Sequence, residues 1–271
     1  MKIAVTTDTH WGFSRSGNRA NLEMNEHIKK ENPDLILHCG DDNSSAYCEK
    51  VEYWKLMRET FPSTPIGIVN GNHSLWDNGD RTVNLDPPYV EPFTPADIIQ
   101  QNMAVWKKND ITYIPDGMEF PDTKVFVTGA DCWYHMDVNT NDKRYIPRYY
   151  FPEGRDWLLK RMYAQFMKAI EDIKEYKEKG YTTILITHFG VVKEAAEVDY
   201  KADPDPRWRR WGTEKEYFGA DPALESLMGD VDYYFYGHSH SFFEETALNG
   251  HTKVINVGSD YEFPRVEFLE V

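Results

Sequence analysis

Short apolar runs recur along the chain, and each has the length of a β-strand rather than of a helix. Several of them contain no polar alternation, which is typical of strands in a sheet that is covered on both faces. The pattern therefore predicts a sheet buried between other layers. The runs lie at residues 3–5, 35–37, 66–69, 125–127, 184–186, 233–236, 254–257 and 266–271.

Amphipathic segments separate the early runs. The sequence predicts helices over about residues 19–31, 45–60 and 154–179, the first ending at Asn32-Pro33 and the last before Gly180. The last helix carries one apolar stripe that includes Leu158, Met162 and Phe166. Strand and helix alternate, which predicts an α/β fold, and about the last 40 residues are expected to form successive strands.

Five of the predicted strands are followed at once by Asp, Asn or His side chains. Ligands of open α/β sheets bind just beyond the carboxyl ends of the strands, so these side chains are expected to converge on one site. A DxH, an HxH or a GNH arises by chance in many chains, and His188 alone would be a structural histidine. All five in this order indicate a functional site. The segments are Asp8-Thr9-His10, Gly40-Asp41-Asp42, Gly71-Asn72-His73, His188 and Gly237-His238-Ser239-His240.

The residue types indicate transition metals. Imidazole nitrogens combined with carboxylate and amide oxygens suit Mn, Fe, Zn or Ni, whereas Mg or Ca would take nearly all oxygen ligands. A two-metal site needs a bridging carboxylate and about three further ligands per ion. Glycines beside Asp41, Asn72 and His238 predict sharp turns that bring the backbone close to a ligand. The candidate ligands are Asp8, His10, Asp41, Asn72, His188, His238 and His240.

This order of motifs resembles the calcineurin-like metallophosphoesterase superfamily, whose pattern is DxH, GD, GNH, a single His and GHxH. The resemblance extends from residue 8 to residue 240. It implies a four-layer αββα sandwich with two packed mixed sheets. It also implies that one metal is bound by Asp8, His10 and His240 and the other by Asn72, His188 and His238. Asp41 would bridge them, and a hydroxide between the metals would attack phosphorus in line.

The resemblance further implies a catalytic role for His73, as general acid to the leaving oxygen or as a positive charge beside the phosphate. Two positions depart from the pattern of many members. Ser44 stands where an acidic residue orients the GNH histidine, and Ser74 stands where Asp or Glu follows GNH. Asp42 and Asp77 lie nearby in the sequence, and the partner of His73 is left open.

Two long segments rich in aromatic and charged residues, 131–152 and 199–219, are expected to be substrate-facing loops of a single domain spanning residues 1–271. In the second, Arg207, Trp208, Arg209 and Arg210 suit a phosphate-bearing, nucleotide-like substrate. The alternative is a surface loop whose Trp side chains pin it to the core. In the first segment, His135 is a candidate phosphate donor, with a structural histidine as the alternative.

The charge balance restricts the partners. The formal net charge is -15, with 45 acidic against 30 basic residues, which argues against a broad nucleic-acid surface or an anionic-membrane binder. Two divalent metals would cancel Asp8 and Asp41 locally, so a small phosphate substrate is compatible with this charge. Three Cys without CxxC spacing, no leader-like N-terminus and no membrane-length apolar run favour a cytoplasmic protein. The sequence indicates no particular oligomeric state.

We therefore expect a metal-dependent phosphoric ester hydrolase with two divalent transition metal ions, of which Mn is favoured and Fe, Zn and Ni are alternatives. A phosphodiesterase is favoured because an aromatic and basic loop suits a group beyond the scissile phosphate. The alternatives are a phosphomonoesterase or protein phosphatase, and a metal-dependent nuclease, which the acidic charge disfavours. A non-catalytic scaffold of the same fold is disfavoured by the complete ligand set.

Overall fold

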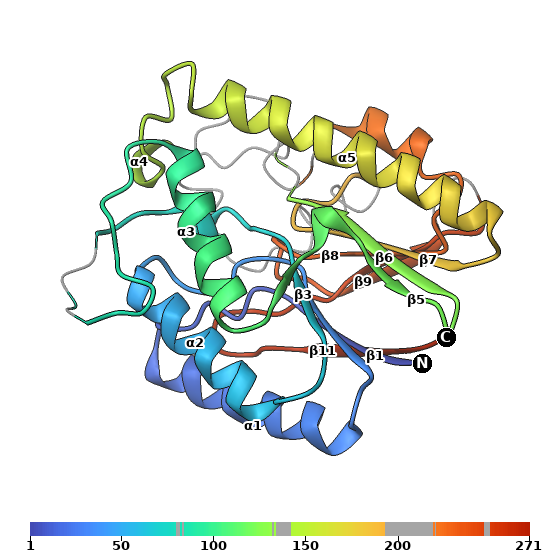
Figure 1. Cartoon of the computed structure of the whole chain (residues 1–271), viewed down its shortest axis with the longest axis horizontal. Helices are drawn as coiled ribbons and strands as arrows, with labels where there is room; N and C mark the ends of the chain where they lie inside the picture. The colour runs from blue at the N-terminus through green and yellow to red at the C-terminus, as the bar shows by residue number, and fades with distance from the viewer. Residues whose placement is uncertain are drawn as a thin grey trace.

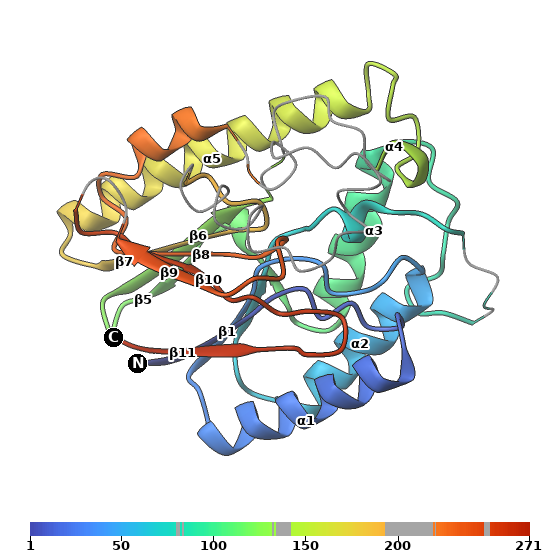
Figure 2. The ribbon, with the colours of Figure 1, turned by 180° about the vertical axis from the view of Figure 1, so that it is seen from behind.

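Two mixed β-sheets pack face to face at the centre of the computed structural model, with helices on their outer faces (Figures 1 and 2). The structure describes residues 1–79, 82, 84–131, 133, 142–192, 219, 221–246 and 250–271. Helices α1 (Arg15–Glu31) and α2 (Tyr47–Thr60) cover the first sheet, and helix α5 (Arg155–Glu178) covers the second. The expected αββα sandwich is therefore confirmed.

The first sheet contains the strands that lead to the N-terminal motifs. Its order is β11-β1-β2-β3-β4. The strands are β1 (Lys2–Thr6), β2 (Leu35–His38), β3 (Ile66–Ile68), β4 (Thr112–Tyr113) and β11 (Val266–Glu270). Strands β1 to β4 are parallel to their neighbours, whereas β11 pairs with β1 in the antiparallel direction, with Thr6 opposite Val266.

The second sheet contains the strands that lead to the C-terminal motifs. Its order is β5-β6-β7-β8-β10-β9. The strands are β5 (Met118–Phe120), β6 (Val125–Ala130), β7 (Thr182–Thr187), β8 (Tyr233–Tyr236), β9 (Phe243–Thr246) and β10 (Lys253–Asn256). Strands β6, β7, β8 and β10 run parallel, and β5 and β9 are antiparallel edge strands.

The helices follow the sequence prediction with two differences. Helix α1 begins at Arg15 rather than near residue 19, because the Ser14 hydroxyl accepts a hydrogen bond from the Gly17 N–H and caps its N-terminus. Helix α3 (Pro95–Lys108) was not predicted, although Thr94 and Asp97 form a capping box at its start. A single turn, α4 (Asp142–Tyr145), precedes α5. None of the described helices is long and apolar enough to cross a membrane.

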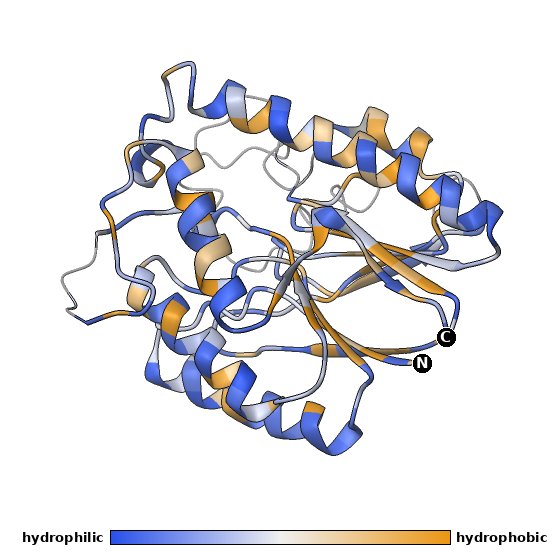
Figure 3. Ribbon diagram, viewed as in Figure 1, coloured by the Kyte–Doolittle hydropathy of each residue, from blue (hydrophilic) through white to orange (hydrophobic). Residues whose placement is uncertain are grey.

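Successive residues of the central strands belong to different hydrophobic cores, because side chains alternate across a strand. In β1, Ile3 packs between the two sheets while Ala4 packs toward α1 and α2. In β7, Ile184 packs between the sheets while Leu185 packs toward α5. Figure 3 shows the resulting concentration of apolar residues along the strands. This packing holds the two sheets together, with the carboxyl ends of their parallel strands at one edge of the molecule.

Candidate metal centre

The seven candidate ligands lie just beyond the carboxyl ends of strands from both sheets. Strands β1, β2 and β3 of the first sheet lead to four of them, and β7 and β8 of the second sheet lead to three. All are buried except His240, whose side chain is 18% exposed. The prediction that these side chains converge agrees with the geometry. The ligands in chain order are Asp8, His10, Asp41, Asn72, His188, His238 and His240.

Five of these seven residues have a left-handed backbone conformation, which is uncommon outside glycine. The φ angles lie between 40° for His10 and 71° for His238. Such a conformation costs about 1–2 kcal/mol per residue and persists where the surrounding structure fixes it. Here it turns the chain sharply after a strand, so the side chain points across the strand ends. The five residues are Asp8, His10, Asp41, His238 and His240.

The glycines of the motifs allow the backbone to approach the ligands. A Cβ on Gly71 would lie 2.0 Å from Asp41 Oδ1, and a Cβ on Gly237 would lie 2.4 Å from Asp8 Oδ2. Both distances are far below van der Waals contact, so no other residue fits without moving a carboxylate. The close approach expected from the sequence is therefore present.

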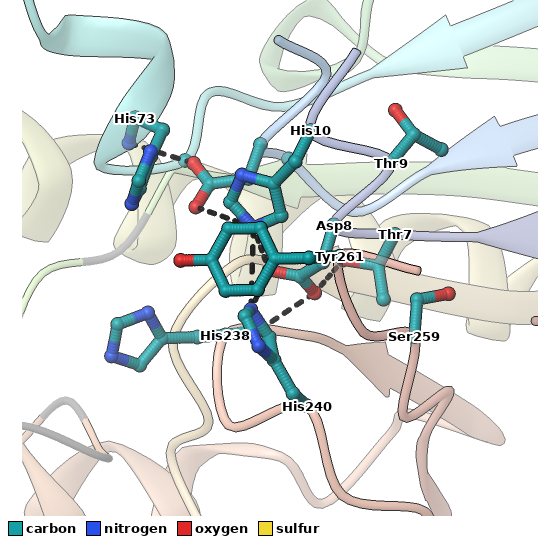
Figure 4. Close-up of polar contacts among 12 residues, drawn as sticks. Thr7, Asp8, Thr9, His10, His73, His238, His240, Ser259 and Tyr261 are labelled. Carbon is teal, nitrogen blue, oxygen red and sulfur yellow. Dashed lines mark hydrogen bonds and ion pairs between the residues drawn. The ribbon is translucent and has the colours of Figure 1, made fainter. Parts of the chain in front are cut away.

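One cluster joins the DxH motif to the last histidine of GHxH (Figure 4). His10 Nε2 lies 3.2 Å from His240 Nε2. Asp8 Oδ1 lies 3.4 Å from His240 Nε2 and 3.8 Å from His10 Nε2. Three donor atoms from residues at opposite ends of the chain thus face one another.

A second cluster joins the GNH motif to the histidines that follow β7 and β8. Asn72 Oδ1 lies 3.0 Å from His188 Nε2 and 3.2 Å from His238 Nδ1. Asp41 lies between the two clusters, because its Oδ2 is 3.3 Å from His188 Nε2 and 3.9 Å from His10 Nε2.

These donor sets fit divalent metal ions. Nitrogen and oxygen ligands bind such ions at about 2.0–2.2 Å, which sets neighbouring donors about 3–3.5 Å apart. Most donor separations in both clusters are of this size. The mixture of imidazole, carboxylate and amide donors is one that transition metals accept.

The carboxyl groups of the centre are ionised. Burial raises their pKa, but hydrogen bonds and charges from neighbouring histidines outweigh burial and hold the pKa of Asp8 and Asp41 below the usual range. Burial lowers the pKa of His188, but the charge of Asp41 raises it to about 9. Burial also lowers the pKa of His240, but hydrogen bonds to Asp260 and Asp8 raise it to about 10. Without metal ions, the two protonated histidines therefore balance the two ionised carboxylates.

A family model described as calcineurin-like phosphoesterase matches residues 1–242. The chain belongs to this family. The resemblance inferred from the motifs is thereby confirmed, and the protein is a metal-dependent phosphoesterase. No curated protein matches its sequence.

Solved structures resemble the fold of this phosphoesterase at low sequence identity. The phosphopantetheinyl hydrolase PptH of Mycobacterium tuberculosis matches with a TM-score of 0.66 and 14% identity, over 98% of this chain and 95% of that one. A dimetal phosphatase of Danio rerio matches with a TM-score of 0.55 and 12% identity, over 96% and 87%. The protein TT1561 of Thermus thermophilus matches with a TM-score of 0.52 and 10% identity, over 96% and 90%.

The orienting partner of His73, left open by the sequence, is a backbone carbonyl. His73 Nδ1 lies 2.7 Å from the Ser44 carbonyl oxygen, which only accepts hydrogen bonds, so Nδ1 carries the hydrogen. The imidazole stacks on Trp76, with ring centroids 3.6 Å apart, and meets His10 edge-on at 4.6 Å. This fixes the ring and leaves Nε2 as the atom that can exchange a proton.

Asp42, the acidic residue next to Asp41, makes structural hydrogen bonds rather than orienting His73. Asp42 accepts hydrogen bonds from Trp54 Nε1 at 2.6 Å and from the Ser74 hydroxyl at 2.8 Å. Ser74, which departs from the family pattern, therefore ties the GNH segment to the loop after β2.

Asp142 is a residue beside the candidate centre that the sequence did not indicate. Its Oδ1 accepts hydrogen bonds from Asn72 Nδ2 at 3.2 Å and from Trp76 Nε1 at 2.6 Å. The first bond directs the amide oxygen of Asn72 toward His188 and His238, and the second holds the ring on which His73 stacks. No motif surrounds Asp142, so only its position in space reveals this role.

Tyr261 is a second residue that the sequence did not indicate. Its ring stacks on His10 with centroids 4.2 Å apart, and the neighbouring Asp260 carboxylate lies 3.5 Å from His240 Nδ1. The connection from β10 in the second sheet to β11 in the first sheet brings both residues to the centre.

His135, Arg207, Trp208, Arg209 and Arg210 lie outside the described residues. Within 131–152, Trp133 and Tyr149 are buried in the core under α5, whereas Tyr150 is 71% exposed.

Proposed function

We propose that this phosphoesterase hydrolyses a small, nucleotide-like phosphodiester with two divalent transition metal ions, of which Mn is favoured. Asp8, His10 and His240 would hold one ion. Asn72, His188 and His238 would hold the other, and Asp41 would bridge them. The observation that carries this proposal is the position of Asp41 Oδ2 between the two clusters, 3.3 Å from one histidine and 3.9 Å from another.

When bound, the two ions would supply a nucleophile at neutral pH and neutralise charge on the phosphate. Asp41 is oriented for the bridging role because its Oδ1 accepts the His73 backbone N–H at 2.8 Å, which leaves Oδ2 for the two clusters. His73 Nε2 would donate a proton to the leaving oxygen or stabilise its charge. The Ser44 carbonyl and the Trp76 ring hold the imidazole for that role.

The preference for a diester rests on the aromatic rings beside the centre. Phe13, which is 53% exposed, lies against Tyr261 with centroids 4.3 Å apart, and Trp76 flanks His73. Such rings can stack on a base or another planar group beyond the scissile phosphate. We also propose that segments 131–152 and 199–219 of a single domain face this group, with His135, Arg207, Trp208, Arg209 and Arg210 as further contacts.

The test is a comparison of bis(p-nitrophenyl) phosphate with p-nitrophenyl phosphate in the presence of Mn and after its removal by EDTA. We expect activity only with Mn and a higher kcat/KM for the diester. Asp41→Asn should lower kcat at least about 100-fold, because it removes the bridging charge. Asp232→Asn is the matched control, since that carboxylate accepts the Thr183 N–H at the opposite end of the second sheet.

Three outcomes would contradict the proposal. Preference for the monoester would identify a phosphomonoesterase or protein phosphatase. Cleavage of single-stranded oligonucleotides in preference to both small esters would identify a nuclease. Binding of two ions without hydrolysis of either ester would identify a scaffold.

A further inference from the structure

Tyr261 lies directly over the proposed metal centre (Figure 4). Its ring centroid is 4.2 Å from that of His10, 4.9 Å from that of His240 and 6.4 Å from that of His73. The residue lies beyond the segment 1–242 that the family model matches. The family motifs therefore assign it no role.

The hydroxyl of Tyr261 has no hydrogen-bond partner among the residues that the structure describes. In Figure 4 it points away from His10 toward the side of the centre where His73 and His238 lie. The Tyr261 side chain is partly buried, and its hydroxyl oxygen can be reached by solvent and therefore also by a ligand. A donor aimed into a catalytic centre and left without a described protein partner is available to a ligand.

A tight turn fixes the backbone of Tyr261. The Phe263 N–H donates to the Asp260 carbonyl at 2.9 Å, and the Asp260 N–H donates to the Phe263 carbonyl at 3.2 Å. The Asp260 carboxylate also accepts the Tyr261 N–H at 2.7 Å. The turn thus supports itself through its own backbone and one side chain.

The same turn is docked on the start of α1. The hydroxyls of Ser14 and Ser16 donate to Glu262 Oε1 at 3.2 Å and 2.6 Å. A Cβ on Gly17 would lie 2.3 Å from the Tyr261 carbonyl oxygen, so the absence of a side chain there permits the docking. The ring of Tyr261 is therefore positioned before any substrate arrives.

We propose that Tyr261 is a substrate-binding residue whose hydroxyl donates a hydrogen bond to a non-bridging oxygen of the phosphate group at the metal centre. This inference rests on the proposed function. The phosphate would be contacted by the tyrosine on one side and by His73 on the other, and the stacked ring would limit how the rest of the substrate leaves the centre.

The variant Tyr261→Phe tests this directly, because it keeps the ring and its stacking on His10 and removes only the hydroxyl. Binding of inorganic phosphate to the Mn-loaded protein is measured by calorimetry, together with kcat and KM for the better ester substrate. We expect the Kd for phosphate to rise about tenfold and kcat/KM to fall by a similar factor. Mn content and Tm should stay at the wild-type values.

Tyr181→Phe is the matched control. It removes a hydroxyl that donates to Glu119 at the far end of the second sheet, 2.7 Å away, and should change neither phosphate binding nor kcat/KM. Wild-type values of both in Tyr261→Phe, with an active parent enzyme, would overturn the role of Tyr261 and leave the proposed function intact. Loss of Mn from Tyr261→Phe would also overturn it, since the residue would then support the metal centre. A wild type that neither binds phosphate nor hydrolyses esters would overturn both.

Discussion

At the scale of single residues, the centre depends on how each donor atom is held. Asp41 has a left-handed φ of 56°, and its two oxygens have separate partners. Oδ1 accepts a backbone N–H, and Oδ2 faces the histidines. The two polar atoms of Asn72 also have separate partners. Its Nδ2 donates to Asp142, and its Oδ1 faces His188 and His238. In both side chains, one polar atom is held by a hydrogen bond within the protein and the other faces the candidate histidine ligands.

The raised pKa values of two histidines at this centre predict that metal binding releases protons. Without metal, the pKa of His188 is about 9 and that of His240 about 10, so both imidazoles are protonated at pH 7. A metal ligand must be neutral, so loading both ions at pH 7 should release up to about two protons, and metal affinity should rise with pH up to about 9. Calorimetry in buffers of different ionisation enthalpy measures this release.

The same two shifts contribute to the pH dependence of the metal-free fold. The pKa values of both histidines are raised by folding, so their contribution to stability is present below about pH 6.5 and is lost as the pH rises through about 9 to 10. Metal affinity that is constant between pH 6 and pH 8, with no proton release, would contradict the predicted protonation.

The convergence of the seven candidate ligands could be predicted from the sequence, because each follows a recognisable strand within a short motif. Asp142 and Tyr261 could not be predicted in this way. Asp142 belongs to one short helical turn, and Tyr261 to a turn that reaches the centre only because β11 crosses to the first sheet. Contacts made through tertiary packing leave no local pattern.

At the scale of elements, the unit that builds the centre is a strand followed by a glycine-assisted turn. In the turn after β3, the absence of a side chain at Gly71 leaves room for the Asp41 carboxylate after β2. The turns after the parallel strands β2 and β3 therefore constrain each other, because the turn after β3 packs directly against Asp41 in the turn after β2.

Gly71→Ala tests this constraint. Its Cβ would lie 2.0 Å from Asp41 Oδ1 and 2.6 Å from the Asp41 backbone nitrogen, so Asp41 must move away from its position between the two clusters. We expect metal affinity to fall about 10–100-fold and activity to fall with it, as measured by Mn titration and ester hydrolysis. Gly229→Ala is the control, because no atom among the described residues lies within 4 Å of its added Cβ. Unchanged Mn affinity in Gly71→Ala would contradict this prediction, because it would show that the turn moves to accommodate the added methyl group.

The sequence predicts some helices and strands well and others not at all. Buried strands such as β1, β2 and β7 and the long helix α5 have strong apolar patterns and appear where expected. Strands β4, β5 and β9 have only two to four residues each, and their pairing partners decide their conformation. Both sheets show the same apolar pattern, so the pattern does not divide the strands between them. That division was expected from the family resemblance.

At the scale of the whole molecule, the proposed metal centre lies where the two sheets meet. The first sheet supplies Asp8, His10, Asp41 and Asn72, and the second supplies His188, His238 and His240. Ions bound at the proposed centre by the folded chain alone would stabilise it by holding the two sheets together at one end.

We therefore expect metal removal to lower the melting temperature. At 100 times the Kd, each ion contributes about 2.7 kcal/mol, which corresponds to about 5–10 °C for a chain of this size. Calorimetric scans with Mn and with EDTA measure the difference. Asp41→Asn should reduce it, and equal melting temperatures with and without bound Mn would contradict the coupling between sheets.

The pairing of β11 with β1 has a consequence for the order in which the protein is made. The hydroxyl of Thr6 donates to the carbonyl of Arg265, a residue 259 positions later in the chain. At about 5–20 residues per second, a ribosome takes tens of seconds to travel that far. During this time β1 has an unpaired edge, and Tyr261 and its turn do not yet exist. A nascent chain can therefore complete the proposed centre only after Tyr261 and β11 have been synthesised.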